Sequence, residues 1–214
     1  MKTRSIAFCL GLTLQALGGC QSAYYAAWEK VGVEKREIMV DRVEDARESQ
    51  EDAQEQFSSA LEEFSALINF QGGELEDVYD RLSDEYEDSK AAADEVSNRI
   101  NKVESVAEAL FNEWEDELER YQNDNYRRSS AQQLRDTRRK YETMLSAMRK
   151  AEGTMAPVLR KLEDNVLFLK HNLNASAIGS LESELTVMQA DIRILIRNMK
   201  SAIAESDAFI ASMK

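Results

Sequence analysis

The sequence predicts an all-α protein, an elongated antiparallel up-down four-helix bundle with coiled-coil-like packing. The first observation is a pair of interleaved seven-residue series over residues 75–121, a stretch without Gly or Pro. The series are Leu75, Leu82, Ser89, Val96, Val103, Leu110, Glu117 and Tyr79, Tyr86, Ala93, Ile100, Ala107, Trp114, Tyr121. Apolar residues at two positions of each heptad, separated by charged residues, indicate helices packed lengthwise. The second observation is that 214 residues include one Pro and eight Gly, so few positions interrupt a helix.

Composition limits the class of protein. With 43% hydrophobic and 31% charged residues, the chain is too polar for an integral membrane bundle and too periodic for a disordered chain. We therefore expect one helical domain over residues 24–214. The formal net charge of −13 argues against nucleic acid as a partner, because phosphate binding depends on clustered Lys and Arg.

The N-terminus has the pattern of a bacterial lipoprotein. Lys2 and Arg4 precede an apolar run over residues 6–17, which is typical of a cleaved signal peptide, here residues 1–19. The following Leu17-Gly18-Gly19-Cys20 resembles the lipobox, in which the Cys receives a diacylglyceryl group and becomes an acylated N-terminus. We expect Cys20 to be the lipid attachment site and residues 20–23 to form a short tether. The alternative is an ordinary signal peptide with an incidental Cys.

Cysteine usage and the residue after the anchor add two expectations. Cys9 lies in the predicted signal peptide and Cys20 carries the lipid, so the mature chain has no thiol for a disulfide, a metal or a nucleophile. In bacterial lipoproteins an Asp after the Cys commonly signals retention in the inner membrane, and Gln21 stands there in this chain. The resemblance therefore implies the outer membrane, with the protein facing the periplasm.

The first two helices are predicted over about residues 24–70 and 75–121. Small residues along the first helix would allow a neighbouring helix to approach closely. Its seam consists of Met39, Ala46, Ala53, Ala60, Leu67 and of Val43, Gln50, Phe57, Phe64. The run Gln71-Gly72-Gly73 predicts the end of this helix, because adjacent glycines adopt positive φ without strain.

The third helix is predicted over about residues 130–172. The run 122–125 indicates a turn, and Ser129 or Ser130 is expected as the N-cap. The seam consists of Leu134, Tyr141, Met148, Met155, Leu162 and Leu169. Pro157 lacks an N–H and should kink this helix, and the unbroken heptad favours a kinked helix over two separate ones.

The fourth helix is predicted over about residues 176–213, after the turn signal at 172–174. It is the most apolar of the four, and we expect it to be the best buried. Its stripe is widened by Ile194, Ile196, Ile203 and Ile210. A helix that crosses a membrane would not tolerate charges as frequent as Arg193, Arg197 and Lys200, so a place in the bundle core is favoured.

An up-down arrangement predicts which residues lie at each end of the bundle. Near the lipid, Trp28, Trp114, Tyr141 and Phe209 are expected to form an aromatic layer. At the far end, roughly 65 to 70 Å away at 1.5 Å per residue, the two turns are expected to form a tip that meets a partner. The candidate tip residues are Gln71, Gly72, Gly73, His171, Asn172 and Asn174.

Charge is distributed unevenly along the chain. Residues 41–119 carry 26 acidic and 6 basic side chains, whereas residues 120–214 carry 11 acidic and 16 basic ones. The basic residues concentrate in what we name the basic flank: Arg127, Arg128, Arg135, Arg138, Arg139 and Lys140. One interpretation is a patch for anionic lipid headgroups or cell-wall polymer. The other, which we favour on the sequence, is ion pairing with the acidic first and second helices.

The spacing of His, Cys, Asp and Glu residues in the sequence does not match that of known metal or catalytic sites. A di-iron bundle needs Glu-x-x-His pairs, but His171 is the one histidine and Phe168 stands three residues before it. Acidic runs such as 113–117 spread around a helix axis instead of converging on a metal. His171 is either a partner contact or pH sensor at the tip, or a turn residue that interacts with the helix dipole. We therefore expect no metal, no cofactor other than the lipid, and no enzymatic activity.

Three segments resemble a known family. They are Leu169-Lys170-His171-Asn172-Leu173-Asn174-Ala175, Phe111-Asn112-Glu113-Trp114-Glu115 and the Gly72-Gly73 turn. With them, the chain from about Tyr24 to Met213 resembles an uncharacterised family of bacterial lipoproteins catalogued as domain of unknown function 2959. The resemblance implies an exported, all-helical envelope protein and carries no catalytic residue to this chain.

Two functions follow from the sequence. The first is a non-enzymatic lipoprotein of the outer membrane, with a structural role or with an envelope protein or peptidoglycan as its partner. The second is an enzyme or regulator that acts on the cell wall, with a polar site at the tip built from His171, Asn69, Asn172 and Asn174. A concave pocket that contains these groups would favour the second function.

Overall fold

The computed structural model describes residues 34–68, 75–172 and 175–214. These residues form helices and no strand, which confirms the predicted all-α class. The predicted signal peptide, the tether and the first ten residues of the first predicted helix lie outside the described residues. The helices are α2 (Lys35–Ile68), α3 (Leu75–Arg120), α4 (Asp124–Gly153), α5 (Met155–His171), α6 (Ala175–Ser180) and α7 (Glu182–Met213).

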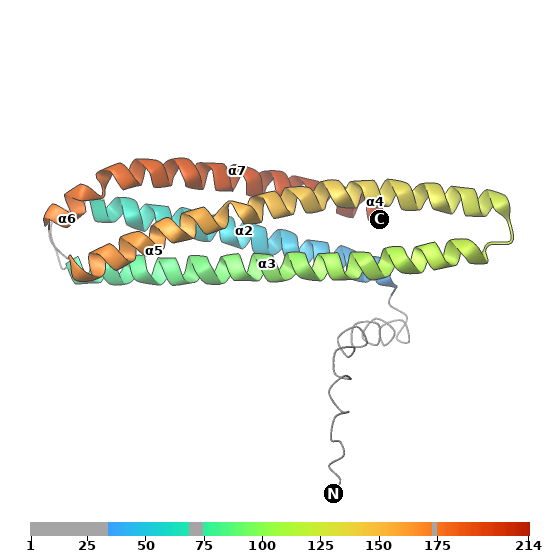
Figure 1. The fold of residues 1–214 in the computed structure, drawn as a ribbon, viewed down its shortest axis with the longest axis horizontal. Helices are drawn as coiled ribbons and strands as arrows, with labels where there is room; N and C mark the ends of the chain where they lie inside the picture. The colour runs from blue at the N-terminus through green and yellow to red at the C-terminus, as the bar shows by residue number, and fades with distance from the viewer. Residues whose placement is uncertain (1–33, 69–74, 173–174) are drawn as a thin grey trace, which may run out of the picture.

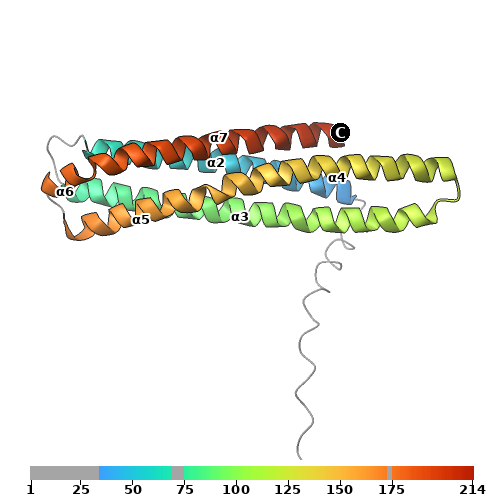
Figure 2. The ribbon, with the colours of Figure 1, turned by 45° about the horizontal axis from the view of Figure 1, so that its top comes forward.

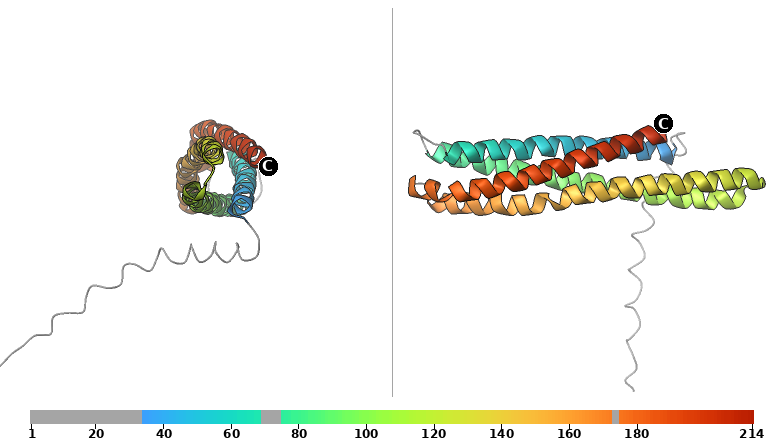
Figure 3. Two further views of the ribbon diagram at one scale, coloured as in Figure 1. Left: turned by 90° about the vertical axis from the view of Figure 1, so that its right-hand side faces the viewer. Right: turned by 90° about the horizontal axis from the view of Figure 1, so that it is seen from above.

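The helices form an elongated bundle (Figure 1). Helix α3 returns antiparallel along α2, and α4 and α5 follow one another back along α3. Helix α7 packs against both α2 and α4, so α2 lies diagonally across the bundle from α4 (Figure 3). The predicted bundle architecture is confirmed, but the described chain has six helices instead of four, because the third and fourth predicted helices are each broken.

The predicted seams of the first two helices form the core. All nine seam residues of α2, including Gln50, have no solvent exposure. In α3 the seam is buried from Leu82 to Leu110, while Leu75 and Trp114 near its ends are half-buried and Glu117 is exposed. A heptad seam of this kind identifies the buried face because residues three and four apart lie on one side of a helix.

The third predicted helix breaks at Thr154, so the prediction of a single kinked helix is wrong. The Thr154 N–H donates to the Ala151 carbonyl at 3.0 Å, and the Thr154 hydroxyl donates to the same oxygen at 2.6 Å. The tightened turn ends α4 at Gly153 and starts α5 at Met155. Pro157 thereby becomes the third residue of a new helix, where its missing N–H interrupts no hydrogen bond of the helix. Helix α5 continues in the general direction of α4 (Figure 1).

Helix α4 begins six residues before the predicted start. Its N-cap is Asn123, whose side-chain oxygen accepts hydrogen bonds from the backbone N–H groups of Asn125 at 2.9 Å and Tyr126 at 3.3 Å. Ser129 and Ser130, the predicted caps, lie inside the helix. Asn is as good an N-cap as Ser. The helix therefore begins directly after Asn123, the earlier of the suitable capping residues.

The fourth predicted helix breaks at Leu181, whose N–H donates to the Ile178 carbonyl at 3.0 Å. Helix α7 is not the best buried helix. Its seam residues Met188, Ile192, Leu195 and Met199 have no exposure, but Ile194 is 46% exposed and Ile196 is half-buried. Of the four Ile residues that widen the stripe, Ile210 is buried, Ile196 and Ile203 are half-buried and Ile194 is exposed, so the wider stripe is only partly buried.

The end of the α3–α4 hairpin projects beyond the rest of the bundle (Figures 1 and 2). The described part of α2 begins level with the last turns of α3, where Lys35 forms a 2.9 Å ion pair with Glu113. The C-terminus lies nearby, since Arg36 donates to the Met213 carbonyl at 2.9 Å. From Glu113 to Arg120, α3 extends about 10 Å further at 1.5 Å per residue.

Candidate functional site

The predicted tip is described in part. Asn69, Gln71, Gly72, Gly73 and Asn174 lie outside the described residues. His171 is the last residue of α5 and is exposed, and Asn172 follows it as the C-cap. The Asn172 side-chain amide donates to the Phe168 carbonyl at 2.8 Å, so this side chain satisfies the end of its own helix.

Exposed apolar side chains lie in the tip half of the bundle, and the sequence did not predict them as a surface. Leu167 and Phe168 on α5 are 53% and 40% exposed, and Val187 and Ile194 on α7 are 44% and 46% exposed. The signal was present, because Leu167 and Phe168 precede the seam residue Leu169 and so fall outside the heptad seam.

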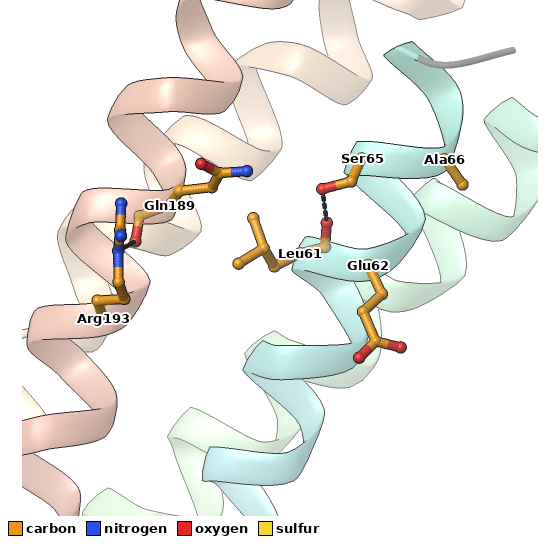
Figure 4. A pocket seen from close by; sticks show the side chains of 6 residues that line it. All are labelled: Leu61, Glu62, Ser65, Ala66, Gln189 and Arg193. Atoms are coloured by element: carbon orange, nitrogen blue, oxygen red, sulfur yellow. Dashed lines mark hydrogen bonds between the residues drawn. The ribbon is translucent and has the colours of Figure 1, made fainter.

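A shallow groove of about 550 Å³ lies between α2 and α7 (Figure 4). It is lined by Leu61, Glu62, Ser65, Ala66, Gln189 and Arg193. The Ser65 hydroxyl donates to the Leu61 carbonyl at 2.8 Å, and Arg193 Nε donates to the Gln189 carbonyl at 2.9 Å. These polar groups are thus engaged within their own helices. The groove contains neither His171 nor Asn172, so it does not gather the polar groups that the enzyme hypothesis requires.

The basic flank lies on α4, close to the projecting hairpin end, and most of it is exposed. Arg127 pairs with Asp124 at 2.7 Å and Arg139 pairs with Asp136, both three residues away on the same helix. Arg128 and Arg135 donate to the neutral amides of Asn125 at 2.5 Å and Gln132 at 2.6 Å. Exposed pairs within one helix contribute little to stability, so these side chains can exchange partners at low cost.

Pairing of α4 with its acidic neighbour occurs at two arginines among the described residues. Arg138, a member of the basic flank, reaches Glu115 of α3 at 2.9 Å and lies 5.0 Å from the ring centroid of Phe111. Arg149, two turns beyond the flank, bridges Glu104 of α3 and Glu152 of its own helix. The predicted internal ion pairs therefore form where α4 enters the four-membered part of the bundle, and Arg138 is the one flank residue that takes part.

An aromatic cluster lies in the bundle next to the point where the α3–α4 hairpin begins to project. The ring of Tyr141 lies 5.4 Å from Phe111 and 6.4 Å from Phe209, both edge-on. Burial raises the pKa of Tyr141 to about 12, and Glu104 adds to the rise. Of the predicted aromatic layer, Tyr141 and Phe209 are in contact and Trp28 lies outside the described residues. Trp114 instead donates to the Ser130 hydroxyl across the hairpin at 2.8 Å.

The described residues include neither a metal-binding cluster nor a membrane-spanning helix. None of their groups of His, Cys, Asp and Glu is arranged to hold a metal ion. None of the described helices is long and apolar enough to cross a membrane.

The fold defines the class: this is an elongated, all-helical bundle protein with charged flanks and an exposed hairpin end. The chain belongs to the family described as "Protein of unknown function (DUF2959)", which matches residues 24–213. This match confirms the family resemblance found in the sequence. No curated protein matches the chain.

Proposed function

We propose that this protein is a periplasmic lipoprotein, anchored to the outer membrane through Cys20, with a non-enzymatic structural or interaction role in the cell envelope. The observation that carries the proposal is Leu17-Gly18-Gly19-Cys20 at the end of the apolar run over residues 6–17. The acyl chains on such a Cys would hold the protein at the membrane, because two or more lipid chains give stable anchoring.

The shape of the bundle supports a role in presenting a surface at a distance from the membrane. Helix α3 has 46 residues and so extends about 70 Å at 1.5 Å per residue. The described part of α2 begins toward the hairpin end, whereas His171 ends α5 at the opposite end (Figure 1). A chain anchored through its N-terminus therefore has its far end, with His171 and the exposed Leu167 and Phe168, available to an envelope protein or peptidoglycan.

Replacement of the anchor residue tests the proposal. Cys20→Ser removes the sulfur to which lipid is attached, so the variant should remain unprocessed or leave the outer-membrane fraction. Cys9→Ser is the matched control, since Cys9 is the other cysteine and lies in the predicted signal peptide. The control should fractionate like the parent, and mass spectrometry of its N-terminal peptide should show the lipid. A Cys20→Ser variant that still fractionates with the outer membrane contradicts the anchor.

A second experiment tests the far end. His171→Ala combined with Asn172→Ala alters an exposed residue and a helix end, so the thermal melting temperature should stay close to that of the parent. If the far end meets a partner, this variant should fail to restore a deletion strain under envelope stress. A variant that melts and complements like the parent would exclude these two residues from the partner surface.

A further inference from the structure

The end of the α3–α4 hairpin, residues 120–128, has the chemistry of a surface that meets lipid headgroups. Residues 121–129 are all exposed. Among them Tyr121 and Tyr126 are 40% and 66% exposed, and Tyr126 is the most exposed large apolar or aromatic residue among those described. Tyrosine concentrates at membrane interfaces because its ring is apolar and its hydroxyl is hydrated.

Three arginines flank these two tyrosines in the sequence. Arg120 ends α3, and Arg127 and Arg128 follow Tyr126 in the first turns of α4. Within residues 120–128 the single acidic residue is Asp124, which pairs with Arg127 in an exposed contact of 2.7 Å. Such a pair is weak in water, so a phosphate group can replace Asp124 as the partner of Arg127.

The acidic residues of α3 do not cancel this charge at the end itself. Glu115, Asp116, Glu117 and Glu119 precede Arg120, and α3 ends before the exposed loop. Glu115 is already engaged by Arg138 at 2.9 Å. A planar surface that meets the hairpin end-on would touch residues 120–128 first and the acidic part of α3 later.

The position of the hairpin end relative to the anchor fits the same partner. It projects at the end of the bundle toward which the described part of α2 begins. Residues 21–33 separate Cys20 from the described chain, and thirteen residues reach at most about 45 Å when extended. A lipid on Cys20 and the hairpin end can therefore meet the same bilayer.

We propose that residues 120–128 dock on anionic phospholipid headgroups of the membrane that carries the anchor, with Tyr121 and Tyr126 at the interface and Arg120, Arg127 and Arg128 on phosphate. This inference rests on the proposed function. A few cations and two aromatic rings bind a bilayer weakly on their own, since stable attachment needs two signals. The anchor supplies the second signal by keeping the hairpin end at high effective concentration near the lipid. The contact would hold the bundle upright.

The chain suits a site-specific test because the mature sequence has no cysteine other than Cys20. The lipidated protein would carry one added cysteine with an environment-sensitive fluorophore, either Gln122→Cys at the hairpin end or Lys170→Cys at the far end. Both positions are exposed. The proteins would be reconstituted in vesicles of phosphatidylcholine alone or mixed with phosphatidylglycerol, and flotation would report anchoring independently of the fluorophore.

The expected result is a blue shift at position 122, with quenching by a lipid-borne quencher, in vesicles that contain phosphatidylglycerol, and no change at position 170. Arg127→Gln combined with Arg128→Gln should abolish most of the shift while the protein still floats. The matched control is Arg160→Gln combined with Arg197→Gln, which removes two exposed arginines elsewhere on the bundle and should leave the shift unchanged.

Four results would overturn the inference. A floating protein whose position 122 stays in water refutes the hairpin contact and leaves the anchor intact. A shift that appears without vesicles and grows with protein concentration, or one produced equally by a soluble anionic polymer, assigns the surface to a second copy or to the polymer instead. A parent that does not float contradicts the anchor and the inference together.

Discussion

Gln50 is a polar residue at a core position of α2, and its replacement should stabilise the protein. It occupies the seam between Val43 and Phe57 and has no solvent exposure. Neither the oxygen nor the nitrogen of its side-chain amide has a hydrogen-bond partner among the described residues. A buried polar group without a partner costs about 1 to 3 kcal/mol. Gln50→Met keeps the length of the side chain and removes both polar atoms.

We therefore expect Gln50→Met to raise the free energy of unfolding by about 1 to 3 kcal/mol. In a chain of this length the melting temperature rises by about 2 to 4 °C for each kcal/mol. Urea unfolding followed by circular dichroism measures the change, provided that the slope of the free energy with urea stays constant between variants. A change in slope would indicate that the denatured state, or the cooperativity of unfolding, has changed.

Gln56→Met is the matched control. Gln56 lies on the same helix, is half-buried, and donates from its amide nitrogen to Glu85 at 2.7 Å. Its replacement should be neutral or lower stability by about 1 kcal/mol, because a hydrogen bond is lost. If Gln50→Met also lowers stability, the amide of Gln50 has a partner in solution and the reasoning fails. A variant that is more stable but populates a second oligomeric state would assign Gln50 the role of specifying register.

Three more predictions concern stability. Leu195→Ala should lower the free energy of unfolding by about 2 to 5 kcal/mol because Leu195 is fully buried. Ile194→Ala should change this free energy by about 0.5 kcal/mol or less because Ile194 is 46% exposed. Equal losses for the two variants in urea unfolding would contradict the difference in burial. Asn123→Ala should lower the free energy of unfolding by about 0.5 to 2 kcal/mol because α4 loses its N-cap. Ser129→Ala should leave the free energy of unfolding unchanged because Ser129 lies inside the helix. A larger loss for Ser129→Ala than for Asn123→Ala would favour the helix start predicted from the sequence. Burial raises the pKa of Tyr141 to about 12, above the value near 10 expected in the unfolded chain. The stability due to this group is therefore complete below pH 10 and is lost as pH rises from 10 to 12. Tyr141→Phe should make the fall of stability over this pH range smaller, and an unchanged pH profile would refute the shift.

Heptad spacing predicted the core well because burial of a helix face depends on the position of each residue around the helix axis. All nine predicted seam residues of α2 are fully buried, and the turn between α3 and α4 lies within one residue of its predicted start. The breaks at Thr154 and Leu181 were not predicted. A single residue that hydrogen-bonds to the third preceding carbonyl leaves the seam in register, so the periodicity does not reveal it.

The site was harder to predict than the core, because exposure at the ends depends on relative helix lengths. The described part of α2 begins level with Glu113, and α7 ends at Met213 beside Arg36, so residues 120–128 project from the bundle. No pattern within the hairpin itself indicates how far the described parts of α2 and α7 reach along it. The sequence therefore predicted the cations of the basic flank but not that most of them are exposed. It also did not predict that Tyr121 and Tyr126 are exposed.

The cross-section of the bundle explains why, among the described residues, the internal ion pairs favoured on the sequence form between α4 and α3 and not between α4 and α2. Helix totals suggested that the acidic α2 and α3 would neutralise α4, but α2 lies diagonally opposite α4. Acidic residues of α2 pair instead with neighbours on α3, as Asp45 does with Arg99 at 2.9 Å and Glu63 with Arg81 at 3.1 Å. An ion pair needs adjacent faces as well as opposite charge, since its energy falls with distance and screening. The arginines at the hairpin end consequently keep local, exchangeable partners, which is the condition that a headgroup phosphate requires.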